Sequence, residues 1–170
     1  MWKDGDELGK ARSYEIIEYR KKITDEICNS KELVKLLGCE NEEHPEDIIP
    51  YKYSFPHEYI PETINKTERY INFEISATID EKNNVYKNLI INFFVMCHKN
   101  VIKYTDNGRQ YLWYDKATCA LDNLFCENNV LGIGKTFLTS NAPYAPQKEF
   151  MGRLLKFEVK DFNNGLKYGK

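Results

Sequence analysis

The chain has 170 residues, of which 42% are hydrophobic and 29% are charged, the balance of one globular domain with its own core. The formal net charge is −2 and the lysines and arginines are spread along the sequence, which argues against sequence-specific binding of nucleic acid. No stretch approaches the roughly 18 consecutive apolar residues of a membrane helix, and the first ten residues lack the apolar core of a signal peptide. We therefore expect a protein that stays in the cytosol where it is made and does not enter a membrane.

Two helical stretches are predicted near the N-terminus, after a polar tail over residues 1–12 that we expect to be mobile. Ser13 is a candidate N-cap for the first helix, and Asn29-Ser30 can break it. The apolar stripe of this helix is Ile16, Ile17, Ile23 and Ile27. Ser30 can cap a second, short helix that ends at Gly38, where a left-handed C-terminal residue is expected.

A long loop is predicted over residues 39–68, most of it the proline-rich stretch from Cys39 to Lys66. Its prolines are Pro45, Pro50, Pro56 and Pro61, and its aromatic residues are Tyr51, Tyr53, Phe55 and Tyr59. Prolines at this spacing argue against a helix and against a central strand. Two interpretations remain open: the aromatic side chains pack back on the core, or they form an arm that contacts a partner.

The clearest pattern is a pair of long antiparallel strands, from Ile71 to Ile79 and from Val85 to Lys99, joined by turn residues at 80–84. The first strand alternates apolar and polar residues, as a half-buried strand does. The second is apolar on both faces, which predicts a central position covered on two sides. Ile90, Phe94 and Met96 make up its second face. Their cover comes either from the same subunit or from a neighbouring one.

The rest of the chain alternates between regular elements and loops. Asp106-Asn107-Gly108 marks a turn, an apolar stripe predicts a helix from Trp113 to Phe125, and an extended segment follows from Leu131 to Ser140. Asn141 to Gln147 is predicted to be a loop because it holds two prolines. Arg153 to Asp161 is the final strand, before a polar tail at 163–170. These elements predict one α+β domain over residues 1–170, an antiparallel sheet of about four strands with an N-terminal and a central helix packed on it.

No group of residues predicts catalysis or a cofactor. Gly132 to Thr136 resembles a phosphate-binding loop, but Asn129 stands where that motif needs glycine and the segment leads into a strand. The five cysteines lack the short pairing of a structural zinc site and are expected to be mostly buried thiols. A thiol protease needs a cysteine and a histidine brought together, and any sequence with three histidines allows such a pair to be drawn, so the histidines alone do not predict this activity. We expect no catalytic residues, no cofactor, no metal and no enzymatic activity.

The order of elements resembles the tail-terminator and head-tail connector (neck) proteins of long-tailed bacteriophages. The segments that carry this resemblance are Tyr70–Ile75, Leu89–Val95, Trp113–Phe125 and Leu154–Val159. The resemblance implies a non-enzymatic virion structural protein of the tail or neck. It implies a ring, commonly of six copies, that stacks on the tail tube beside neighbouring tube or connector proteins and is assembled in the cytoplasm of the bacterial host.

Two aromatic loops supply the candidate subunit or partner contacts. The residues are Tyr51, Tyr53, Phe55 and Tyr59 in the first loop and Asn141 and Tyr144 in the second. Two alternatives remain open. One is a tail-tube or baseplate protein with the same logic of assembly. The other is a small cytosolic enzyme or ligand-binding domain with a pocket beneath the loop at 39–66, in which His57 or His98 would reach a cysteine or carboxylate.

Overall fold

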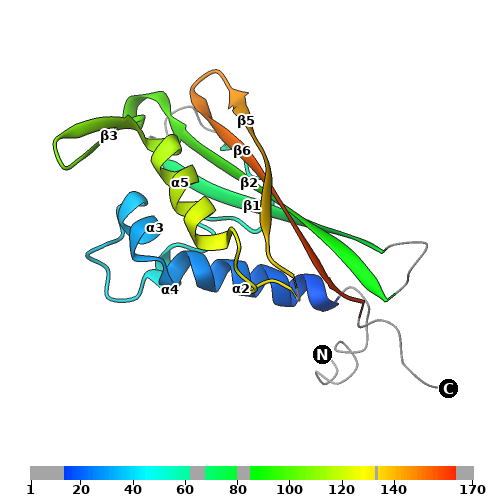
Figure 1. Ribbon diagram of the computed structural model, residues 1–170. Coiled ribbons are helices and arrows are strands. Elements are labelled where there is room, and N and C mark those ends of the chain that lie inside the picture. Colours follow the sequence, from blue (N-terminus) through cyan, green and yellow to red (C-terminus); the bar gives the residue numbers. More distant parts are fainter. Residues whose placement is uncertain (1–13, 62–67, 80–84, 133, 164–170) are drawn as a thin grey trace.

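The computed structural model describes residues 14–61, 68–79, 85–132 and 134–163, and its centre is an antiparallel four-stranded sheet (Figure 1). The strands are β1 (Arg69–Ile79), β2 (Tyr86–His98), β5 (Phe137–Gln147) and β6 (Phe150–Phe162), in the spatial order β1-β2-β6-β5. The predicted α+β class and the predicted sheet are therefore confirmed. As its doubly apolar pattern predicts, β2 lies in the middle of the sheet.

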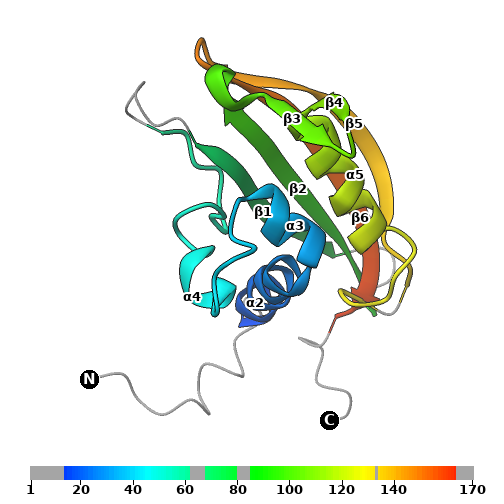
Figure 2. The same cartoon turned by 90° about the vertical axis from the view of Figure 1, so that its left-hand side faces the viewer.

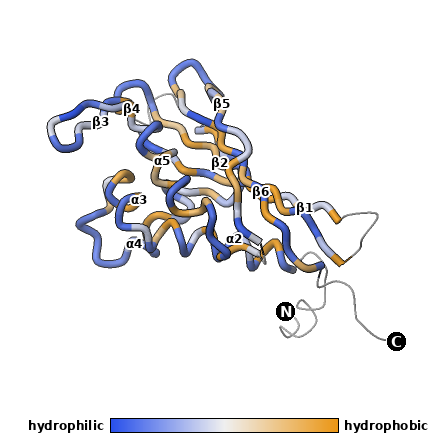
Figure 3. The backbone as a smooth tube through the Cα atoms, in the orientation of Figure 1, coloured by the Kyte–Doolittle hydropathy of each residue, from blue (hydrophilic) through white to orange (hydrophobic). Residues whose placement is uncertain are grey.

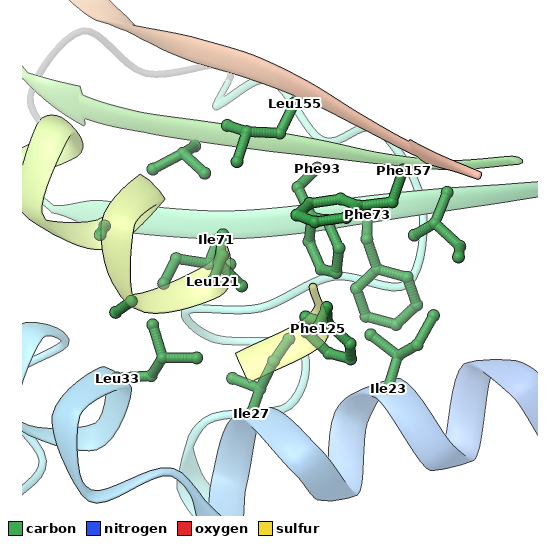
Figure 4. Close-up of a cluster of buried hydrophobic side chains, with 14 of the residues drawn as sticks. Ile23, Ile27, Leu33, Ile71, Phe73, Phe93, Leu121, Phe125, Leu155 and Phe157 are labelled. Atoms are coloured by element: carbon green, nitrogen blue, oxygen red, sulfur yellow. The ribbon is translucent and has the colours of Figure 1, made fainter. Parts of the chain in front are cut away.

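Helices cover one face of this sheet. They are α2 (Tyr14–Asn29), α3 (Lys31–Leu36) and α5 (Trp113–Phe125), and Figure 2 shows them on the same side of the strands. Their apolar side chains meet the alternate residues of β1, β2 and β6 in one core, which includes Ile23, Leu121 and Phe93 at 0% exposure (Figure 4). The indole Nε1 of Trp113 donates to the carbonyl of Leu36 at 2.7 Å, which ties α5 to α3.

The predicted helix signals near the N-terminus are confirmed where the structure describes them. Ser30 lies between α2 and α3, and its side chain accepts a hydrogen bond from the amide of Leu33 at 3.4 Å. Gly38 follows α3 with a φ of +76°, the left-handed conformation that glycine adopts without strain. The predicted cap at Ser13, the tail at 1–12, the turn at 80–84 and all of the predicted tail at 163–170 except Asn163 lie outside the described residues. Asn163 itself is buried and its amide donates to the carbonyl of Val85 at 2.8 Å, so it belongs to the fold and not to a mobile tail.

A small hairpin was predicted as no more than a turn. The strands β3 (Lys103–Asp106) and β4 (Arg109–Leu112) follow the single 3₁₀ turn η1 (Lys99–Val101) and form a separate two-stranded sheet. Asn107 and Gly108 form its turn with φ values of 48° and 75°, the signs that a tight hairpin needs. Figure 1 shows the hairpin projecting from the body of the domain.

Two predictions that were based on proline residues are wrong. The segment Asn141–Gln147 is not a loop: it is the second half of β5, which continues through Pro143 and Pro146. The strand lies at the edge of the sheet, where a missing amide costs no ladder hydrogen bond, and its register with β6 shifts between Tyr144 and Gln147. Likewise Pro45 does not exclude a helix, because it opens the short helix α4 (Pro45–Ile48) at a position where no amide is needed.

Two strand boundaries also differ from the prediction. The segment predicted to be extended from Leu131 becomes a strand at Phe137, and the last strand begins at Phe150. The hydrophobic parts of the chain lie along the strands and on the inner sides of the helices, whereas the β3–β4 hairpin and the connection from α3 to α4 are hydrophilic (Figure 3). Within the described ranges, no helix has the length and hydrophobicity to cross a membrane.

Candidate subunit interfaces

The loop that precedes β1 binds the free edge of that strand. The amide of Ile71 donates to the carbonyl of Tyr53 at 2.9 Å, and the amide of Phe73 donates to that of Phe55 at 3.0 Å. The side chain of Asn72, 0% exposed, accepts from the amide of Phe55 at 3.1 Å and donates to the carbonyl of Tyr59 at 3.1 Å. The alternation of β1 predicted that Asn72 faces water, and this prediction is wrong. The Asn72 side chain is buried and holds the loop against the sheet.

The aromatic residues of this loop cover the second face of the sheet at the start of β1. Tyr70, Met96 and Phe150 form a small buried cluster on that face, and Phe55, Tyr59 and Tyr144 pack against it. Met96 is 0% exposed and Phe94 is 9% exposed. The cover over Met96 thus comes from the same subunit, and it is the loop and not the N-terminal helix that supplies it.

The structure places the six candidate contact residues in different surroundings. Tyr53, Phe55, Tyr59 and Tyr144 are half-buried by contacts within the subunit, whereas Asn141 is exposed. The hydroxyl of Tyr144 donates to Glu58 at 2.6 Å, and the Asn141 side chain accepts from Arg153 at 2.7 Å. Burial and the Glu58 carboxylate raise the pKa of Tyr144, so its hydroxyl keeps its proton.

Tyr51 is the most exposed of the six, at 69%, and it lies in the left-handed region with a φ of 60°. A groove of about 400 Å³, which we call the α2 groove, lies between α2 and the segment that contains Tyr51. Its lining residues include Arg20, Lys21 and Asp25. Ile17 of α2 lines the same groove and is 53% exposed. Tyr51 and Ile17 together therefore offer apolar area to another molecule, although Ile17 had been predicted as part of the buried stripe.

The other end of the second sheet face is bare. Ile90 and Phe137 both pair with Glu158, so they lie on the same face, and Phe137 is 53% exposed while Ile90 is half-buried. A hollow of about 280 Å³ adjoins Phe137 and also contacts Thr139 and Lys160. Ile90 was predicted to need a cover, and the described part of the subunit supplies one for Met96 and Phe94 but leaves this end open.

A buried group of charges lies at the same end of the molecule, on the helix side of the sheet. The ammonium of Lys87, whose side chain is 4% exposed, binds Glu15 of α2 and lies 3.9 Å from Asp161 of β6. The hydroxyl of Tyr19 donates to Asp161, and this bond together with burial raises the pKa of Tyr19. Ile16, Tyr19, Ile79 and Lys87 are among the residues that line a cavity of about 400 Å³ here, which we call the distal cavity.

No local pattern predicts this charge group, because Lys87 and Glu15 are 72 positions apart and each has the sequence surroundings of an ordinary surface residue. The one available signal was the register of the strand. Lys87 shares a face with Leu89, Ile91 and Phe93, so an alternation count places it on the core side. A lysine at such a position needs an acidic partner.

The residues tested for chemistry take structural positions. His98 is 5% exposed, and its Nε2 is 4.0 Å from Glu149, while His57 is exposed beside Phe55. Cys28, Cys39 and Cys97 are buried and Cys119 is exposed, and burial raises the pKa of Cys97 to about 12. The segment that resembles a phosphate-binding loop leads directly into β5, which is the strand entry that the sequence predicted.

Comparison with known proteins gives one match. The model of the family described as YomW matches residues 30–159, which include the described elements from α3 through β5 and most of β6. The family name is of a type used for phage and prophage proteins, which suggests a phage-related protein without specifying a role. No curated protein and no solved structure matches the chain.

Proposed function

The chain belongs to the YomW family, and on that premise we propose that it is a phage virion structural protein that forms a ring at the end of the tail tube, as a tail terminator or head-tail connector. The proposal assigns the chain a role in assembly and no catalytic step. Its place is the tail or neck of the virion, after assembly in the cytoplasm of the bacterial host. Its partners are further copies of itself, six in the arrangement that the resemblance implies, and the adjacent tube or connector proteins.

The observation that carries the proposal is the uneven covering of the sheet. Helices bury most of one face, up to the exposed end of β1 at Ala77 and Ile79, whereas among the described residues the second face is covered only at the end where Phe55 and Tyr59 pack. At the other end Ile90 and Phe137 remain accessible beside polar and charged side chains, among them Glu158. A half-covered sheet offers one subunit a broad, rigid surface for lateral packing against the next.

Two exposed apolar areas lie on different parts of the subunit, which favours a ring over a two-fold dimer. One area contains Tyr51 and Ile17 beside the α2 groove, and the other contains Phe137 beside the hollow on the second sheet face. When two different patches of the same chain bind each other, the contact is heterologous and closes into a ring if the rotation allows it.

The polar groups beside the distal cavity also agree with a structural role. Lys87 is held between two carboxylates, and Tyr19 donates to one of them, so these groups are engaged with each other. A group that transfers protons during a reaction has to reach a substrate atom. The α2 groove adjoins the described part of the loop at 39–66, and neither His57 nor His98 is among its lining residues.

The test is the mass of the assembled protein. The purified chain, alone and mixed with the tail-tube protein encoded beside it, is measured by native mass spectrometry and imaged by electron microscopy. A ring with six times the subunit mass of 20.1 kDa, seated on the end of the tube, is the expected result. A chain that stays monomeric with the tube protein present, and that is missing from purified particles, contradicts the proposal.

A further inference from the structure

We propose a further contact between neighbouring copies, in addition to the packing of their exposed apolar areas: the tip of the β3–β4 hairpin enters the distal cavity of the next copy and places the Arg109 guanidinium beside its buried charge group. This inference rests on the proposed ring and adds a second pair of partner surfaces, which are two parts of the same chain. It is carried by the exposure of the hairpin, the charges of the cavity and the positions of the two features on the subunit.

The β3–β4 hairpin contains few interactions of its own that could keep it folded. It contains two strands of four residues, and an isolated two-stranded hairpin is marginally stable at best in water. Each residue of β4 is exposed, including Tyr111 at 36% and Leu112 at 41%. An element of this kind, held out from the body of a compact domain, gains stability when a partner covers it.

One side of the hairpin is nevertheless tied to the domain, so its direction is set. Asp106 lies 3.6 Å from Lys35 of α3 and 3.5 Å from Lys116 of α5, and the Lys116 ammonium lies over the ring of Tyr111 at 5.1 Å. These contacts occupy the one acidic side chain of the hairpin. Arg109, the exposed residue that follows the turn, leaves the tip with a positive charge.

The charge group beside the distal cavity has the opposite charge. Glu15 and Lys87 line the cavity and Asp161 lies 3.9 Å from the Lys87 ammonium, so two carboxylates and one ammonium leave the group with an excess of one negative charge. The Oε1 atom of Glu15 is buried and has no hydrogen-bond partner among the described residues. An unpaired buried acceptor is costly, and a guanidinium is the group best suited to supply planar donors to a carboxylate. Ile79, at the rim, is 39% exposed and can cover the apolar stem of an arginine.

The hairpin and the cavity lie at opposite ends of the subunit. In Figure 1 the hairpin projects at one end of the subunit, beside the first turn of α5, while the first turns of α2 lie at the other end with the tips of β1 and β2. A projection at one end and an acceptor at the other is the arrangement of a head-to-tail contact, and repetition around an axis closes the ring.

The decisive experiment uses two variants that damage opposite sides of the contact. Arg109→Glu reverses the charge of the tip, and Ile79→Lys places a positive charge at the rim of the cavity. Each variant alone, measured by sedimentation with the tail-tube protein present, is expected to self-associate at least about tenfold more weakly than the unmodified chain. Mixed one to one, the two are expected to associate more strongly than either variant alone, because the intact hairpin of one meets the intact cavity of the other, and the negative tip of Arg109→Glu meets the positive rim of Ile79→Lys. Lys148→Glu, the same charge reversal at an exposed site between β5 and β6, is the matched control and leaves the ring intact.

A cross-linking experiment tests the same contact between copies without using the two charge variants. In a Cys119→Ser background, which removes the exposed native thiol, Gln110→Cys near the tip and Ala77→Cys in the cavity wall are introduced together. Oxidation is expected to link successive copies into a ladder on a non-reducing gel, and neither cysteine alone gives that ladder. Rings that form unchanged with Arg109→Glu and give no ladder overturn this inference and leave the proposed function standing. A chain that is monomeric with the tube protein and gives no ladder overturns both.

Discussion

The ring of Phe55 is stacked on the ring of Tyr59, with centroids 4.0 Å apart and an angle of 16° between the planes. Both rings approach Tyr70 of β1, at 6.4 Å from Phe55 and 5.7 Å from Tyr59. The two stacked rings cover the buried cluster on the second sheet face, and we call this cover the roof. Through the roof, a segment that is not a strand takes part in the hydrophobic packing of the domain. The proline-rich segment is therefore part of the folded core of this subunit.

Removal of one ring from this stack should destabilise the fold. Phe55→Ala takes away the ring that contacts both Tyr59 and Tyr70 and is expected to lower the free energy of unfolding by about 2 kcal/mol, since Phe55 is half-buried. Urea denaturation followed by fluorescence measures this change. Tyr51→Ala, at an exposed site in the same segment, should stay within about 0.5 kcal/mol. Equal effects for the two substitutions would show that the roof adds nothing to stability.

Gly152 tests the close approach of β6 to β2. A Cβ atom at this position would lie 1.8 Å from the carbonyl oxygen of Val95, which is backbone and cannot rotate away. Gly152→Ala is therefore expected to cost about 3 kcal/mol or more, because the two central strands must separate. Thermal unfolding measures the loss. Gly134→Ala is the matched control, since the nearest atom to its added Cβ is at 3.8 Å, and a similar loss there would contradict this explanation.

Lys87 should be needed because its partners are buried with it. Lys87→Met leaves Glu15 and Asp161 without their cation and is expected to lower the free energy of unfolding by about 3 kcal/mol. The double change of Lys87→Met with Glu15→Leu removes an acidic partner as well and should recover much of the loss. Chemical denaturation of the two variants separates these effects. A double variant less stable than Lys87→Met would mean that the ion pair itself, and not the unpaired charge, dominates.

The buried thiols predict how stability changes in alkali. Burial raises the pKa of Cys97 to about 12 and that of Cys28 to about 11, whereas in the unfolded chain both titrate near 9. Their contribution to stability is therefore complete below pH 9 and is lost as the pH rises toward 11 and 12. Each such thiol adds a slope of about −1.4 kcal/mol per pH unit to the free energy of unfolding in this window.

Cys97→Ala isolates one of these contributions. The variant should be less stable at pH 7 because a buried side chain is truncated, yet its stability should fall less steeply between pH 9 and 12. Unfolding curves at a series of pH values give the two slopes. Parallel slopes for the variant and the unmodified chain would show that Cys97 does not titrate differently in the folded state.

Local patterns in the sequence were sufficient for elements whose burial follows a simple period. The stripe from Trp113 to Phe125 predicted α5 with its bounds, and the run from Leu89 to Cys97, apolar on both faces except at Asn92, predicted the central strand. Ser30 and Gly38 marked the ends of α3 because capping depends on the few residues around a helix end. The strand entry after Gly132 could also be recognised, since a phosphate-binding loop needs glycine where Asn129 stands.

Patterns that depend on a distant partner could not be resolved in the same way. The two prolines in β5 indicate a loop unless the strand is known to lie at the edge of the sheet, and strand order is a property of the assembled fold. Phe55 and Tyr59 carry the same sequence signal whether they pack on their own subunit or on another. In the structure they pack on their own subunit, where the side chain of Asn72 accepts a hydrogen bond from the amide of Phe55 and donates one to the carbonyl of Tyr59.

The sequence by itself determined the fold class, the central strand and its flanking helices, because apolar periodicity follows directly from which side of an element faces away from water. Only the tertiary structure decided that the aromatic loop is a roof, that the hairpin stands clear of the domain and that Lys87 is enclosed with two carboxylates. Each of these depends on contacts between residues far apart in the chain. Their energies come from burial and charge pairing in three dimensions, which a one-dimensional pattern does not contain.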